Sequence, residues 1–232
     1  MNIYVMTLFP EMLDAALSLS IIGRARKSGA VGLNFVNIRD FSGNKHNNVD
    51  DYPYGGGAGM VMRAQPIYDA YRHITAQLPY PAASARVLFM SPQGRRFDQR
   101  MARELSREAS LIILCGHYEG VDERVVEEIV TDEVSLGDFV LTGGEIAAMA
   151  VIDAVVRLKD GVLGSDRSAL DESFSSCLLE YPQYTRPEEF MGRRVPDVLL
   201  SGHHANIEKW RRERAMERNR RKRPDLLQMS EH

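Results

Sequence analysis

Residues 110–120 read SLIILCGHYEG, an apolar run that ends in a polar loop bounded by two glycines. The first six residues, 110–115, have the length and the continuous apolar character of a strand that is buried on both faces. Two other stretches share this plan of an apolar strand followed by a glycine-bearing turn, at 85–94 and 132–144. Because a helical pattern follows each stretch, the sequence predicts an α/β fold with a mostly parallel sheet.

The remainder of the first 160 residues extends this pattern. We predict a strand at 2–8, helical segments to Lys27, a strand at 31–38, a loop at 39–62 and a helix at about 65–77. The helix expected from Gly144 to about Lys159 is apolar almost all round. Such a helix must be buried, either in the core or in an interface between subunits.

A change of composition marks the end of this domain. Residues 160–176 are rich in Gly, Ser and Asp, which is typical of a linker, and a long basic helix is expected at about 205–221. We therefore predict an α/β domain at 1–160, a flexible linker at 161–176 and a small helical domain at 177–232.

Positive charge is concentrated near the C-terminus. The 232 residues carry a net charge of only −3, but basic side chains crowd the stretch 209–223, opposed only by Glu213 and Glu217. Intrahelical ion pairs can neutralise part of this charge, so a merely solvated helix face is one interpretation. The other is that the basic helix binds a polyanion such as RNA.

Several classes of protein are disfavoured. Neither the dinucleotide fingerprint G-x-G-x-x-G nor the phosphate-binding G-x-x-x-x-G-K-[ST] occurs, and neither does H-E-x-x-H. Cys115 and Cys177 form no C-x-x-C pair, so we expect reduced thiols and no metal site. The chain shows no signal-peptide pattern and no apolar run of the roughly 18 residues that a membrane helix needs. We expect a cytoplasmic protein.

The turns after the three strands carry the functional signal. In open α/β sheets, ligands bind beyond the carboxyl ends of the strands. Glycine lets the backbone approach a ligand closely. Any one turn is equally consistent with an ordinary strand–helix connection, but three together favour a nucleotide-like ligand that is held by backbone groups.

The same segments resemble the bacterial tRNA (guanine-37-N1)-methyltransferases of the SPOUT class over nearly the whole chain. The most specific strings are GHYEGVDER at 116–124 and SLGDFVLTGGE at 135–145. Further matches are LFPEM at 8–12, SPQG at 91–94 and LSGHH at 200–204.

The resemblance implies a deep C-terminal trefoil knot that binds S-adenosylmethionine, and a homodimer with its active sites at the subunit interface. Two positions depart from the family: His117 stands where many members have arginine, and Phe139 where many have tyrosine. The residues that match the family's cofactor-binding positions are Gly116, Leu136, Gly137, Asp138, Phe139, Val140 and Leu141, with Pro92, Tyr118, Glu119, Gly143 and Gly144 in the supporting pocket.

The resemblance also implies the chemistry. Guanine N1 must lose its proton before it attacks the methyl group, and the family uses a linker aspartate before a Ser-Phe pair as the base. Here Glu172 precedes Ser173-Phe174, so we assign the base to Glu172, with Asp171 as the alternative. Arg157 holds the position of the arginine that assists the base.

The expected substrate is a tRNA with guanosine at positions 36 and 37. In the basic domain, we expect RNA contacts from His203, Arg211, Arg212 and Arg214. Two alternatives stay open: a methyltransferase of the same class that modifies another RNA position, and a non-catalytic tRNA-binding protein.

Overall fold

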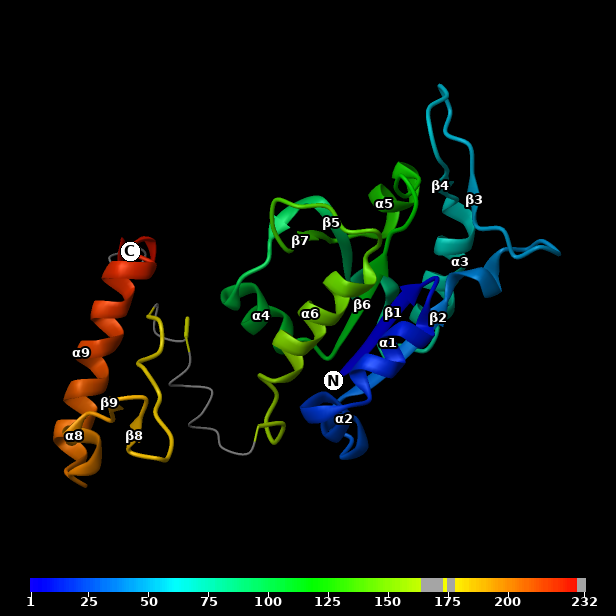
Figure 1. Ribbon diagram of the computed structural model, residues 1–232. Helices are drawn as coiled ribbons and strands as arrows, with labels where there is room; N and C mark the ends of the chain where they lie inside the picture. Colours follow the sequence, from blue (N-terminus) through cyan, green and yellow to red (C-terminus); the bar gives the residue numbers. More distant parts are fainter. Residues whose placement is uncertain (164–172, 175–177, 229–232) are drawn as a thin grey trace. The chain divides into compact units, whose positions relative to one another are not determined.

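The computed structural model describes residues 1–163, 173–174 and 178–228. The chain divides into two compact units, Met1–Gly164 and Ser165–His232 (Figure 1). Glu172, to which we assigned the base, and Asp171, the alternative, lie outside the described residues.

Unit 1 is built on a five-stranded sheet in which every pair of neighbouring strands is parallel. The strand order is β2-β1-β6-β5-β7, with bounds β1 Asn2–Thr7, β2 Gly32–Asn37, β5 Arg86–Arg96, β6 Ser110–Cys115 and β7 Asp132–Ser135. All six residues of β6 are buried, as the continuous apolar run at 110–115 predicts. The prediction of an α/β fold with a mostly parallel sheet is confirmed.

Helices cover both faces of this sheet (Figure 1). Apolar side chains of α1 Pro10–Leu17, α2 Ser20–Lys27, α4 Gln99–Ser106 and α6 Glu145–Val156 join one core cluster, and those of α3 Ala64–Thr75 and α5 Glu123–Ile129 join the other. Strand β6 supplies alternate side chains to the two clusters, Leu111 and Ile113 to the first and Ile112 and Leu114 to the second. Over the described ranges, no helix combines the length and the apolar character needed to cross a membrane.

Two sequence predictions need correction. The stretch 39–62 is more than a loop, because it contains η1 Ile38–Phe41 and the antiparallel strands β3 Asp50–Asp51 and β4 Val61–Met62. Strands of two residues leave no hydrophobic periodicity by which the sequence could reveal them. A further short helix, η2 Ala82–Ser84, precedes β5.

The second correction concerns SPQG at 91–94, which is part of a strand and not a turn. Strand β5 continues to Arg96 and pairs with β7 in two registers, with a shift between Met90 and Arg95. A Cβ atom on Gly94 would lie 2.3 Å from the carbonyl carbon of Glu133. Glycine is therefore required here, because the backbones of β5 and β7 touch.

Helix α6 is the apolar helix that the sequence predicts. Seven of its residues are buried, among them Ala148, Val151 and Val155. Its remaining face is partly apolar as well, since Ile146 is 47% exposed and Ala150 is exposed. An uncovered apolar strip on a helix of this kind is what a subunit interface would use.

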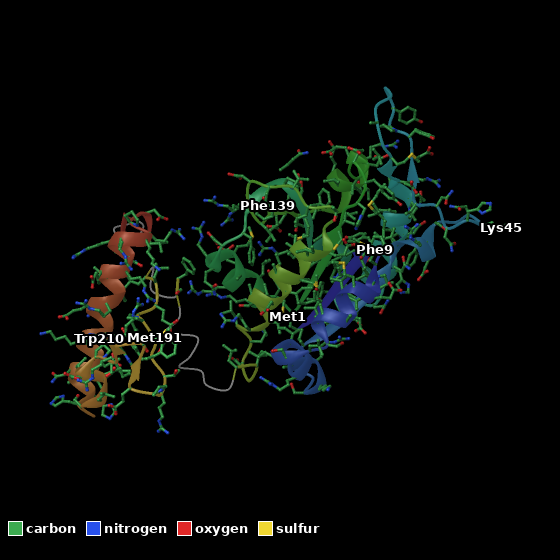
Figure 2. The ribbon with its side chains drawn as sticks, viewed as in Figure 1. Met1, Phe9, Lys45, Phe139, Met191 and Trp210 are labelled. Atoms are coloured by element: carbon green, nitrogen blue, oxygen red, sulfur yellow. The ribbon has the colours of Figure 1, made fainter. Side chains whose placement is uncertain are left out.

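The described residues of unit 2, 173–174 and 178–228, include a short hairpin and three helices, β8 Glu189–Phe190, β9 Arg193–Arg194, α8 Asp197–Leu200, α9 His204–Lys222 and α10 Asp225–Gln228. The basic stretch forms α9, and the hairpin was not foreseen. The buried Asn219 on α9 accepts a hydrogen bond from the Leu179 backbone N–H at 2.7 Å, and Arg218 donates to the Glu180 carbonyl at 3.0 Å. Figure 2 shows Trp210 on α9 and Met191 in the hairpin turn.

Candidate active site

A cavity of about 320 Å³ opens at the edge of the sheet where β6 and β7 end, beside the middle of β5. Its walls come from four segments of unit 1, residues 89–93, 116–121, 133–137 and 139–144, with Glu123 and Ala147 beside them. This is the position at which open parallel sheets bind ligands, and the volume lies at the lower end of the range for small-molecule pockets.

The structure gathers the residues that sequence comparison assigned to the cofactor. The predicted positions that line the cavity are Pro92, Gly116, Tyr118, Glu119, Leu136, Gly137, Phe139, Val140, Leu141, Gly143 and Gly144. Asp138 belongs to the same loop but is not part of the lining.

The charge of the lining restricts the ligand. Glu119, Glu123 and Glu133 contribute carboxylates, and among the described lining residues there is no lysine or arginine. Carboxylates disfavour an anionic, phosphate-rich ligand and favour a cationic group. Apolar walls from Phe89 and Leu141 suit a planar base.

Backbone contacts shape the loop that follows β7. The Ser135 hydroxyl accepts a hydrogen bond from the Gly137 N–H at 3.1 Å, and the Phe139 N–H donates to the Gly137 carbonyl at 2.9 Å. At the end of the loop, the Gly144 N–H donates to the Gly116 carbonyl at 3.0 Å. This last bond joins the loop after β7 to the loop after β6.

The glycine-rich segment between β3 and β4 also reaches the cavity wall. The Glu119 N–H donates to the Met60 carbonyl at 3.0 Å, and the Met62 N–H donates to the Gly120 carbonyl at 2.9 Å. A Cβ atom on Gly59 would lie 2.5 Å from Cγ of Glu119. Gly59 therefore allows this segment to lie directly against a cavity residue.

A buried polar cluster below the cavity was missed by sequence reasoning. The Glu145 side chain is 2% exposed, and its carboxylate is bonded to Thr7 at 2.6 Å and to His117 at 2.7 Å. Burial raises the pKa of the neighbouring Cys115 thiol well above its usual value, and the charge of Glu145 adds to this shift. The signal in the sequence was a carboxylate at the start of a helix that is apolar almost all round.

Arg157 lies far from the cavity within one chain. It follows α6 directly, whereas Glu145 begins that helix beside the cavity. Twelve residues of α-helix separate the two by about 18 Å. One chain therefore does not bring Arg157 to the cavity that the other site residues surround.

In unit 2 the basic residues of α9 divide into two groups. Arg211 lies over the Tyr181 ring at 4.7 Å and Arg214 pairs with Glu217, so both have partners within the unit. Lys209, Arg212 and Arg220 line a groove of about 600 Å³ along α9, which Arg214, Glu213 and Glu217 line as well.

His203 directly precedes α9, and its carbonyl accepts the N–H groups of Asn206 and Ile207, at 3.0 and 3.1 Å. Its side chain makes no capping hydrogen bond. The imidazole therefore contributes nothing to the start of this helix.

The fold and site together define an α/β protein with a backbone-lined, acidic small-molecule site at the carboxyl ends of parallel strands. The sequence profile of the family described as tRNA (Guanine-1)-methyltransferase TrmD matches residues 1–229, and the chain belongs to this family.

Individual relatives agree over the full length. A tRNA (guanine-N(1)-)-methyltransferase of Lachnospira eligens is 58% identical over 228 residues, which are 98% of this chain and 95% of the relative. The enzyme of the same name from Exiguobacterium sibiricum is 58% identical over 231 residues, 100% of this chain and 93% of the relative. The one from Geobacillus kaustophilus is 53% identical, covering 98% and 91%. The resemblance inferred from the sequence motifs is confirmed.

Proposed function

We propose that this protein transfers the methyl group of S-adenosylmethionine to N1 of guanosine 37 in tRNA. Membership of the family supports methylation of guanine N1. The observation that carries the choice of methyl donor is the cavity lined by three glutamates, glycine backbone and apolar walls.

The residues present suit this cofactor. Its sulfonium is cationic, which fits the carboxylates of Glu119, Glu123 and Glu133, and its adenine needs apolar walls and backbone hydrogen bonds such as the loop 136–141 offers. When bound, the cofactor supplies an electrophilic methyl group. The protein positions the cofactor and the guanine base and carries out the proton transfer.

Proton removal falls to the linker carboxylate in this proposal. Glu172 takes the proton from guanine N1, a step for which a positioned base accelerates a reaction by about 10²–10⁴. The guanidinium of Arg157 faces O6 and stabilises the negative charge that develops there. Asp171 is the alternative base.

A homodimer completes this site. Arg157 lies about 18 Å along α6 from Glu145, which begins the helix beside the cavity of its own chain. If two copies of α6 pack antiparallel through their exposed strips at Ile146 and Ala150, the end of one helix lies beside the start of the other. Arg157 of the partner subunit then reaches the cavity.

We further propose that the cofactor loop forms the trefoil knot. In the sheet, β5 lies between β6 and β7, yet the chain leaving β7 returns to the end of β6, where Gly144 bonds to Gly116. To do so it must pass the extended part of β5, residues 91–96. This crossing supports a threaded path, which folds otherwise almost never adopt.

For tRNA binding we propose the groove on α9. Lys209, Arg212 and Arg220 line it beside Glu213 and the Arg214–Glu217 ion pair, and their charges can contact successive phosphates. His203, at the start of the same helix, is a further candidate contact.

The decisive test is methylation with base mapping. We expect the protein to transfer label from S-adenosylmethionine to a tRNA with guanosines at 36 and 37, and to leave the matched transcript with adenosine at 37 unlabelled. Label at another nucleotide would refute the position. Cofactor-independent tRNA binding without transfer would refute the activity.

The base is tested separately by two matched variants in single-turnover reactions. Glu172→Gln should lose most of the rate, by about 10²–10⁴, while cofactor binding survives. Asp171→Asn should stay near the wild-type rate. The reverse result would assign the base to Asp171.

A further inference from the structure

Three segments of unit 1 that are distant in sequence meet at one buried carboxylate. Thr7 ends β1, His117 follows β6 and Glu145 begins α6. The Thr7 hydroxyl donates to Oε1 of Glu145 at 2.6 Å, and Nε2 of His117 lies 2.7 Å from Oε2. The carboxylate thus ties the ends of two strands to the start of a helix.

The cluster is closed on its inner side. Thr7 is fully buried, and its hydroxyl oxygen also accepts the Phe9 N–H at 2.9 Å. Because an ionised carboxylate only accepts hydrogen bonds, it needs donors on both oxygens at this depth. The Thr7 hydroxyl supplies one, and with Glu145 ionised His117 supplies the other through Nε2–H.

On its outer side the cluster packs against backbone that lines the cavity. A Cβ atom on Gly143 would lie 2.2 Å from Nε2 of His117, so the imidazole lies directly against Gly143. Glu145 is bonded through the chain to Gly144, whose N–H holds the Gly116 carbonyl. His117, Gly143, Gly144 and Gly116 all line the cavity, whereas Thr7 and Glu145 do not.

We propose that Glu145 is the positioning residue of the cofactor site, holding the loops at 116–117 and 142–144 in register through its bonds to His117 and Thr7. This inference rests on the proposed use of S-adenosylmethionine. It assigns a role to residues that touch no cofactor.

The test uses Thr7, because this residue lies outside the cavity and offers a matched pair of variants. Thr7→Val keeps the shape but leaves Oε1 of Glu145 and the Phe9 N–H without their partner, whereas Thr7→Ser keeps the hydroxyl. Binding of S-adenosylhomocysteine to the full-length protein is measured by calorimetry, at a temperature at which both variants are folded. We expect Thr7→Val to bind about tenfold more weakly than Thr7→Ser.

Two further readouts separate positioning from general stability. In steady-state assays, Thr7→Val should raise the KM for the methyl donor about tenfold and leave kcat within about twofold, because the reacting groups are untouched. Hydrogen exchange should become faster at the Gly144 amide and stay unchanged in α3.

The outcomes are distinct. Equal affinity of Thr7→Val and Thr7→Ser, with only the unfolding midpoint lowered, would overturn the positioning role and leave the proposed function intact. A wild-type protein that binds no S-adenosylhomocysteine would overturn the proposed function, and the positioning role with it.

Discussion

Gly143 and Gly144 are adjacent, but a methyl group on each would meet a different obstacle. On Gly143 it would lie 2.2 Å from the His117 ring, a side chain that can turn aside but then loses its bond to Glu145. On Gly144 it would lie 2.7 Å from Cα of Cys115, which cannot turn aside. Overpacking costs about 1–3 kcal/mol, so Gly143→Ala should fall at the lower end and Gly144→Ala at the upper end in urea unfolding. Equal losses would show that the backbone of α6 shifts freely.

The Cys115 thiol should not react with alkylating reagents while the protein is folded. The residue is fully buried, and burial together with the charge of Glu145 holds the pKa of its thiol well above the usual value. The thiolate is the reactive species, so at neutral pH the thiol should be alkylated only after the protein unfolds. In a Cys177→Ser background, the iodoacetamide reaction should therefore follow the unfolding transition. Rapid labelling of the native protein would contradict this burial.

At the scale of elements, the junction of β5 and β7 carries an ion pair whose contribution depends on pH. Arg86 donates to both oxygens of Asp132, at 3.0 and 3.1 Å. Burial alone would raise the pKa of Asp132, but the hydrogen bonds from Arg86 and Thr131 outweigh it and leave the pKa below its ordinary value of 3.8. A carboxyl shifted in this direction stabilises the fold above its unfolded pKa and loses that contribution as the pH falls through the folded pKa.

Asp132→Asn should therefore destabilise the protein by about 1 kcal/mol at neutral pH. The difference from wild type should close as the pH falls below about 3.8, because both proteins then lack the charge. Urea midpoints measured across this range test the claim, with Glu127→Gln on the exposed face of α5 as the control. A difference that persists unchanged in acid would assign the effect to packing.

The elements that the sequence predicted well are those with a long hydrophobic signal. Strand β6 and helix α6 are predictable because all residues of β6 and most residues of α6 are buried, so their sequences are almost entirely apolar. The continuation of β5 through Gly94 could not be foreseen, because it depends on contact with the backbone of Glu133, a neighbour in space only. The glycines in the sequence marked the loops that line the cavity. The partners of Glu145 could not be predicted, because Thr7 and His117 are its neighbours in space only.

At the scale of the whole molecule, net charge conceals how basic residues are used. The chain carries −3 overall, and several arginines of its C-terminal part are already paired, Arg214 with Glu217 and Arg223 with Asp225. Lys209, Arg212 and Arg220 line the α9 groove beside the paired Arg214 and Glu217, and these three are called the groove cations. A polyanion that docks on this helix would gain most from the groove cations, since the paired ones must first give up their carboxylates.

This division predicts how tRNA binding responds to salt. Each cation that neutralises a phosphate contributes about 0.7–0.9 to the slope of log K against log salt. The double variant Arg212→Gln/Arg220→Gln should therefore flatten the slope by about 1.5, measured by filter binding between low and physiological salt. The matched double variant Arg211→Gln/Arg223→Gln removes the same formal charge from two arginines that have partners and do not line the groove, and it should change the slope much less. Equal flattening by both variants would mean that only total charge matters, and the groove would lose its assignment.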